Sequence, residues 1–165
     1  MTPPFRIEPM RPDDVPAVAA IEGPTRMDEL QLRGEVERSW SRLWVAREQD
    51  GVVVAYLVAW HVVDELHVLN VATREDRRRQ GIGRALMDAV VSYASQRQVA
   101  HVLLEVRRSN RPAIELYRAV GFFAMGVRAR YYPDDEDAVE MVLALDPESG
   151  AVVAHADEVR LDGDA

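Results

Sequence analysis

The sequence predicts an α/β fold in which a mixed sheet of about seven strands carries helices on both of its faces. Strand-like and helix-like segments follow one another in the order β-α-α-β-β-β-α-β-α-β-β, judged from the period of the apolar residues. Asp50-Gly51 lies between two β-branched runs, which is typical of an antiparallel hairpin. A long amphipathic segment then joins two later strands, as in a strand-helix-strand unit. The chain of 165 residues is long enough to bury one core.

Each element of the first half follows from a local pattern. Alternating polarity predicts the first strand, and β-branched runs predict the later ones. Pro12 opens a helix, and Gly23-Pro24 ends it. The expected segments are a strand at 5–9, helices at 12–21 and 27–40, and strands at 43–47, 52–62 and 65–73.

In the second half, residues typical of helix caps mark the two ends of a helix. Ser109 or Asn110 caps a helix that has Pro112 in its first turn, and Gly121 fits the C-terminal cap. The composition after Asp146 is mixed and polar, so we expect one domain over 1–146 and a loosely ordered tail over 147–165. The expected segments are a helix at 81–98, a strand at 100–107, a helix to 119, and strands at 122–132 and 138–145.

Composition excludes several classes of function. The chain has no cysteine, which rules out disulfides, thiolate metal sites and a cysteinyl intermediate. Its four histidines lack metal-ligand spacing, and no serine lies in a G-x-S-x-G turn, so we expect no metal site and no serine nucleophile. The net charge of −8 argues against nucleic-acid binding. The longest apolar run, 52–60, is far shorter than the ~20 residues of a membrane span, and a secretion signal is not evident, so we expect a cytoplasmic protein.

Two closely spaced glycines mark a candidate anion site. Gly81 and Gly83 lie where the arginine-rich loop 74–79 becomes a helix. Glycine allows a close approach to the backbone, and a helix N-terminus presents unpaired N–H groups. The pattern therefore indicates either a phosphate-bearing ligand or merely a tight entry turn. Leu86 stands where a dinucleotide fingerprint would need a third glycine, and a P-loop motif is missing, so neither of these two nucleotide-binding motifs is present.

Two titratable residues in the second half are candidates for proton transfer. Glu105 shares one face of its expected strand with Leu103, so it is either a carboxylate paired with an arginine or a general base whose pKa burial raises. Tyr117 lies on the apolar face of the following helix and is either a core residue or a general acid.

A third group of residues lies near the end of the domain. Adjacent Tyr131 and Tyr132 end an expected strand and either pack there or form a wall of a substrate groove. The basic cluster over 74–84 and the acidic cluster over 134–140 are either solvated loops or patches for an anionic cofactor and a cationic substrate.

The chain resembles the Gcn5-related N-acetyltransferase (GNAT) superfamily and, within it, the RimI-type ribosomal-protein alanine N-acetyltransferases. The resemblance covers residues 5 to 145, roughly, and depends on three groups of motifs. These are NVAT (70–73) with RQGIGRAL (79–86), LEVRRSN (104–110), and AIELYR (113–118) with GF (121–122), YYP (131–133) and EDA (136–138).

The resemblance implies the GNAT acyl-CoA N-acyltransferase fold and direct transfer of an acetyl group from acetyl-CoA to the N-terminal α-amine of a protein, with coenzyme A as product. It makes Glu105 the base and Tyr117 the acid that protonates the departing thiolate. Tyr131 and Glu22 are the candidate substrate-binding residues. The residues expected to bind the cofactor are Val71, Ala72, Thr73, Arg79, Gln80, Gly81, Ile82, Gly83, Arg84 and Asn110.

One departure from the family pattern leaves the substrate open. RimI-type enzymes carry a Pro-Trp-Ser-like element in an early loop, and residues 23–28 lack it. The resemblance implies a protein N-terminus, such as that of a ribosomal protein, as partner of a monomer or weak dimer. The alternatives are acetylation of a lysine side chain or small amine, and an acyl-CoA-binding module without turnover.

Overall fold

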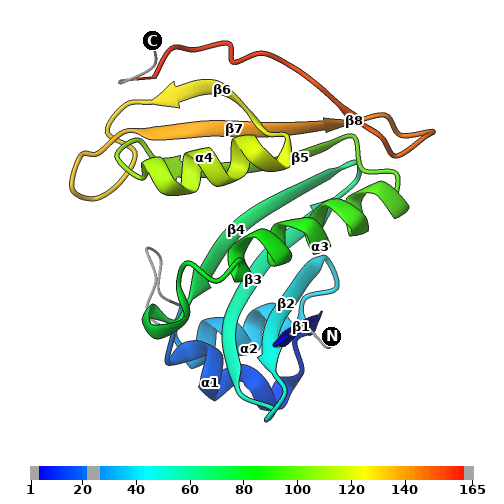
Figure 1. The fold of residues 1–165 in the computed structure, drawn as a ribbon, viewed down its shortest axis with the longest axis vertical. Helices are drawn as coiled ribbons and strands as arrows, with labels where there is room; N and C mark the ends of the chain where they lie inside the picture. The colour runs from blue at the N-terminus through cyan, green and yellow to red at the C-terminus, as the bar shows by residue number, and fades with distance from the viewer. Residues whose placement is uncertain (1–3, 22–26, 162–165) are drawn as a thin grey trace. The chain divides into compact units, whose positions relative to one another are not determined.

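The computed structural model describes residues 4–21 and 27–161, which form two compact units (Figure 1). Unit 1 comprises Met1–Val62 and Val68–Val90, and unit 2 comprises Val63–His67 and Val91–Ala165. The strand β4 (Glu65–Thr73) and the helix α3 (Ile82–Gln96) each contribute residues to both units.

The sheet part of unit 1 follows the order β1-β2-β3-β4. β1 pairs antiparallel with β2, and β2 pairs antiparallel with β3 across the expected hairpin, with a register shift at Ala46/Arg47. Apart from β4 and α3, the elements of this unit are β1 (Phe5–Pro9), η1 (Pro12–Asp14), α1 (Val15–Ala19), α2 (Glu29–Glu37), β2 (Ser41–Glu48), β3 (Val53–Val62) and η2 (Glu75–Arg77).

The core of unit 1 joins α1 and α2 to the strands. Apolar residues at helical spacing on the two helices meet the inward-facing residues of β2, β3 and β4. The buried members of this cluster are Val15, Val18, Ile21, Leu32, Val45, Val53, Tyr56, Val58 and Ala72. Arg47 is also buried here, with its charge paired to Asp14 at 2.8 Å and to Glu8.

Unit 2 contains the start of β4, the end of α3 and the strands and helix that follow them. The start of β4 pairs parallel with β5, and β7 pairs antiparallel with both β5 and β6, which confirms the expected mixed sheet. Asn110 caps α4 by accepting a hydrogen bond from the Ala113 N–H at 3.3 Å, and Gly121 ends the helix at φ 125°. The elements are β5 (His101–Arg107), α4 (Arg111–Val120), β6 (Phe123–Arg128), β7 (Ala138–Leu145) and β8 (Val152–Val153).

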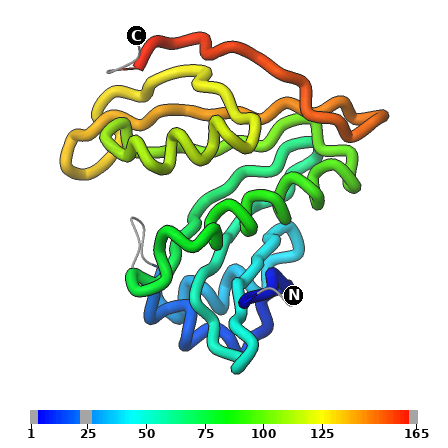
Figure 2. Tube along the Cα trace, in the orientation of Figure 1, coloured from blue at the N-terminus to red at the C-terminus, as the bar shows by residue number. Residues whose placement is uncertain are grey.

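The segment after Asp146 makes more specific contacts than its sequence suggests. Figure 2 shows it running beside β6. β8 pairs with the end of β7. The Asp157 carboxylate accepts hydrogen bonds from the Ala124 N–H at 2.8 Å and from Arg118 at 2.6 Å, and Leu161 is buried. The edge of β6 offers unpaired backbone groups, and these contacts satisfy some of them.

Three other segments differ from expectation. The helix expected over 27–40 is shorter, and the one over 12–21 divides into η1 and α1. β6 ends at Arg128, so Tyr131 and Tyr132 lie in the loop between β6 and β7 and not on a strand. Within the described parts of the chain, no helix is long and apolar enough to cross a membrane.

Candidate active site

The Gly-x-Gly segment of unit 1 forms an open helix entry. Gly81 has φ 79° and Arg79 has φ 64°, both in the left-handed region that favours glycine. A Cβ at Gly81 would meet no atom within 4 Å. The Ala85 N–H donates to the Gly81 carbonyl at 3.0 Å, and the N–H groups before it have no partner within the helix. These features suit the oxygen atoms of a phosphate or pyrophosphate.

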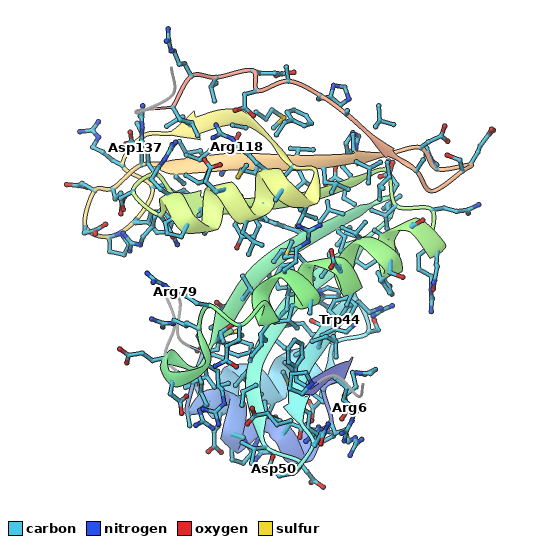
Figure 3. All side chains as sticks on the ribbon, viewed as in Figure 1. Arg6, Trp44, Asp50, Arg79, Arg118 and Asp137 are labelled. Atoms are coloured by element: carbon cyan, nitrogen blue, oxygen red, sulfur yellow. The ribbon has the colours of Figure 1, made fainter. Side chains whose placement is uncertain are left out.

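Ion pairs neutralise much of the basic cluster around this entry. Arg74 pairs with Asp76 at 2.6 Å, Arg77 with Glu48 at 3.0 Å, and Arg84 with Asp88 at 3.1 Å. Arg79 is exposed and, within the described residues, has no ionic partner; Figure 3 shows it projecting from the loop before α3. An anion at this entry would therefore depend on backbone N–H groups and on fewer unpaired arginines than the sequence predicts.

The end of β4 lies beyond its pairing with β5. The parallel pairing with β5 uses only Glu65, Leu66 and His67. The backbone of Val71, Ala72 and Thr73 is not used by that pairing. Ala72 is buried in the core of unit 1, which anchors this segment.

Glu105 in unit 2 is hydrogen-bonded to a histidine. The His67 Nε2 lies 2.9 Å from the Glu105 Oε2. This hydrogen bond is the largest influence on the pKa of both groups. It lowers the pKa of Glu105 below its ordinary value and raises the pKa of His67. Of the two alternatives for Glu105, the described residues do not show the pair with an arginine. Burial acts to raise the carboxyl pKa, but the hydrogen bond to His67 outweighs it, so the pKa is lowered overall.

His67 is a residue that the sequence analysis did not single out. The histidines were judged by metal spacing, whereas His67 meets Glu105 through the parallel register in which it stands opposite Leu103. Alternating faces on both strands bring the two side chains to the same side. Only the register could have identified this pair.

Tyr117 is buried on α4. Its side chain is 7% exposed, and its ring centroid lies 5.8 Å from that of Phe122. Burial, with a smaller contribution from Tyr132, raises the pKa of Tyr117 to about 12. The hydroxyl group has no hydrogen-bond partner within the described residues. It therefore remains protonated at neutral pH and has its proton available to a ligand.

The loop between β6 and β7 is stabilised by Arg107. Its guanidinium lies 4.2 Å from the ring centroid of Tyr132 and pairs with Asp134 at 2.9 Å and with Glu136 at 3.0 Å. Tyr131 meets Tyr132 edge to face, with centroids 5.1 Å apart. The loop thus holds two aromatic rings in a defined arrangement.

Most carboxylates of the acidic cluster form ion pairs with arginines of this chain. Asp137, labelled in Figure 3, pairs with Arg108 at 3.0 Å and accepts a hydrogen bond from the Arg130 N–H. Glu140 pairs with Arg128. With Asp134 and Glu136 bound to Arg107, these carboxylates order the loop, and the expected acidic rim for a cationic substrate is correspondingly weakened. Glu22, the other candidate substrate-binding residue, lies outside the described residues.

Comparison with known proteins defines the class. The sequence profile of the acetyltransferase (GNAT) family matches residues 8–122, so the chain belongs to this family. It is 40% identical over 100 residues to the ribosomal protein bS18-alanine N-acetyltransferase of Escherichia coli strain K12, covering 59% of this chain and 68% of that one. It is 36% identical over 121 residues to the N-alpha-acetyltransferase of Sulfurisphaera tokodaii, covering 66% and 72%.

Solved structures agree with the sequence relatives. The crystal structure of the ribosomal-protein-S18-alanine N-acetyltransferase from Escherichia coli matches with a TM-score of 0.78 at 31% identity, covering 93% of this chain and 97% of that one. The GNAT fold and the RimI-type resemblance are confirmed. The protein is an N-acetyltransferase of a family that uses acetyl-CoA.

Proposed function

We propose that this enzyme acetylates the N-terminal α-amine of a protein, with a ribosomal protein that begins with alanine as the favoured partner. The names of the Escherichia coli relatives support this substrate class. The observation that carries the proposal is the pair of proton-transfer groups in unit 2, an ionised Glu105 and a protonated Tyr117. An α-amine has a pKa of about 8, well below the ~10.4 of lysine, so a weak base is sufficient to accept its proton.

The donor acetyl-CoA supplies a thioester, and the chain offers backbone groups suited to the rest of that molecule. We assign the pyrophosphate to the backbone N–H groups of residues 79–84. At Gly81 no other atom lies within 4 Å of the position that a Cβ would occupy, so a ligand can approach the backbone there. Val71, Ala72 and Thr73 present backbone groups for the pantetheine arm. Asn110 uses its side-chain oxygen as a helix cap, so its amide N–H₂ can donate to the cofactor.

The proposed reaction is a direct displacement. The amine nitrogen forms a bond to the thioester carbonyl carbon, and the carbon–sulfur bond breaks. Glu105 accepts the proton that the amine nitrogen loses, directly or through water, and Tyr117 donates a proton to the sulfur as it departs. Coenzyme A leaves as the free thiol. A proton then returns from Glu105 to Tyr117 through solvent, so both groups regain their starting states without a covalent enzyme intermediate.

The test is thiol release from acetyl-CoA with two matched peptides. Both peptides begin Ala-Arg and contain an internal lysine. One has a free α-amine, and the other has the same sequence with an acetylated N-terminus. We expect turnover with the free peptide only. Turnover with the blocked peptide would contradict the proposal in favour of lysine. Turnover with neither would favour a small amine or an acyl-CoA-binding module.

A further inference from the structure

His67 contacts the candidate base in unit 2 and is the more exposed of the two side chains. Its side chain is 40% exposed, whereas that of Glu105 is 18% exposed. The imidazole Nε2 faces the carboxylate Oε2 at 2.9 Å. The contact is set by the register of two paired strands, since His67 stands opposite Leu103 and Glu105 is two residues further along the same face of β5. The geometry is therefore built into the sheet.

The contact occupies one oxygen of the carboxylate. While Glu105 is ionised, the hydrogen atom between the two groups belongs to Nε2, because a carboxylate can only accept. The second nitrogen, Nδ1, is then the one that gains or loses a proton. The contact with His67 does not use the other oxygen, Oε1, which we assign to the proton taken from an amine.

Charged groups on neighbouring elements act on the pair in opposite directions. Arg128 on β6 opposes protonation of His67, whereas Glu65 on its own strand favours it. Glu140 on β7 stands opposite Glu105 in the strand register and pairs with Arg128, which moderates the effect of that arginine. The groups that act on the pair or stand opposite it are Glu65, Arg128, Glu140 and Tyr132, and Tyr131 acts on Arg128.

We propose that His67 is a positioning residue that sets the strength of Glu105 as a base, so that the enzyme is active when the imidazole is neutral and inactive when it is protonated. This inference rests on the proposed function, since it concerns how the base of that reaction is controlled. A neutral imidazole holds and orients the carboxylate by one hydrogen bond. An imidazolium makes an ion pair with it and lowers its affinity for the amine proton.

The control acts at a higher pH than it would for an ordinary histidine. The pKa of His67 is raised above the ordinary histidine value of about 6.5, mainly by the Glu105 hydrogen bond. His67 is therefore neutral only at pH values above that raised pKa. Activity increases as the pH rises through it.

The first experiment is the pH profile of kcat at saturating acetyl-CoA and saturating amine, for the wild type and His67→Gln. Glutamine can donate the same hydrogen bond but cannot take up a proton. We expect the acidic midpoint of the wild-type profile to move at least one pH unit lower in His67→Gln, with kcat at pH 8.5 within threefold of wild type. An unchanged midpoint would overturn the inference.

His101→Gln is the matched control. His101 is an exposed histidine on β5, opposite Glu65, and it does not contact Glu105. Its substitution is expected to leave the kcat profile unchanged. A shift as large as that of His67→Gln would show a general surface-charge effect and would contradict the specific role of His67.

The second experiment needs no substrate. An NMR titration of the histidine rings is expected to give a His67 midpoint that falls by at least half a pH unit in Glu105→Gln, while that of His101 stays constant. Equal His67 midpoints in the two proteins would overturn the coupling whether or not His67→Gln folds. Failure of the proposed function is distinguishable from failure of this inference. In the first case the two matched peptides show no α-amine acetylation, whereas the NMR titration still tests the coupling of His67 to Glu105.

Discussion

Tyr117→Phe separates catalysis from folding unusually well in this protein. The substitution removes one oxygen atom and keeps the ring, whose 7% exposure and 5.8 Å contact with Phe122 account for its packing. The hydroxyl has no hydrogen-bond partner within the described residues, so its removal breaks no native hydrogen bond. The free energy of unfolding should therefore stay within about 0.5 kcal/mol of wild type.

The expected effect on turnover is much larger. With a pKa of about 12, roughly one Tyr117 hydroxyl in 10⁵ is ionised at pH 7, so almost every enzyme molecule carries the proton that the sulfur needs. Loss of a positioned general acid costs about 10²–10⁴ in rate, or roughly 2.7–5.5 kcal/mol in activation free energy. The affinity for acetyl-CoA should change little, because the hydroxyl acts on the sulfur only as it departs.

The assay combines stopped-time thiol release with thermal melting and acetyl-CoA titration of the same preparation. A kcat at least tenfold below wild type, with unchanged melting temperature and cofactor affinity, is the expected result. A kcat within threefold of wild type would refute the role of Tyr117 as the acid. A parallel loss of stability would show that the hydroxyl supports the fold.

Three other substitutions test the remaining parts of the site and the fold. Glu105→Gln should lower kcat at least tenfold with unchanged cofactor affinity, and wild-type turnover in the thiol-release assay would argue against Glu105 as the base. Arg107→Met removes the ion pairs and the ring contact of the β6–β7 loop. The peptide KM should therefore rise several-fold, while kcat and the acetyl-CoA KM stay close to wild type. Equal peptide KM values in the variant and the wild type would mean that the loop does not bind substrate. Arg47→Met leaves the buried Asp14 carboxylate without its cationic partner, which should cost about 3–5 kcal/mol and lower Tm by roughly 6–20 °C in a thermal melt, whereas an unchanged Tm would refute the contribution of this pair.

Local patterns were sufficient for most of the fold. The strands 65–73 and 138–145 have the bounds that their polarity predicts, and Asn110 and Gly121 cap α4 as expected. These features depend on residues close together in the chain, because side-chain period, cap chemistry and glycine conformation act over a few positions. The loop of Tyr131 and Tyr132 was misjudged as a strand because its contacts to Arg107 are distant in sequence.

The sequence by itself determined the class of protein, the open helix entry at Gly81 and the candidate residues Glu105 and Tyr117, since each follows from a motif or a local period. Tertiary structure alone decided which groups act on those residues. The register of β4 against β5 brings His67 to Glu105, and the packing of α4 removes water from Tyr117. Both effects change proton affinities through contacts between residues far apart in the chain, and a local pattern holds no information about such contacts.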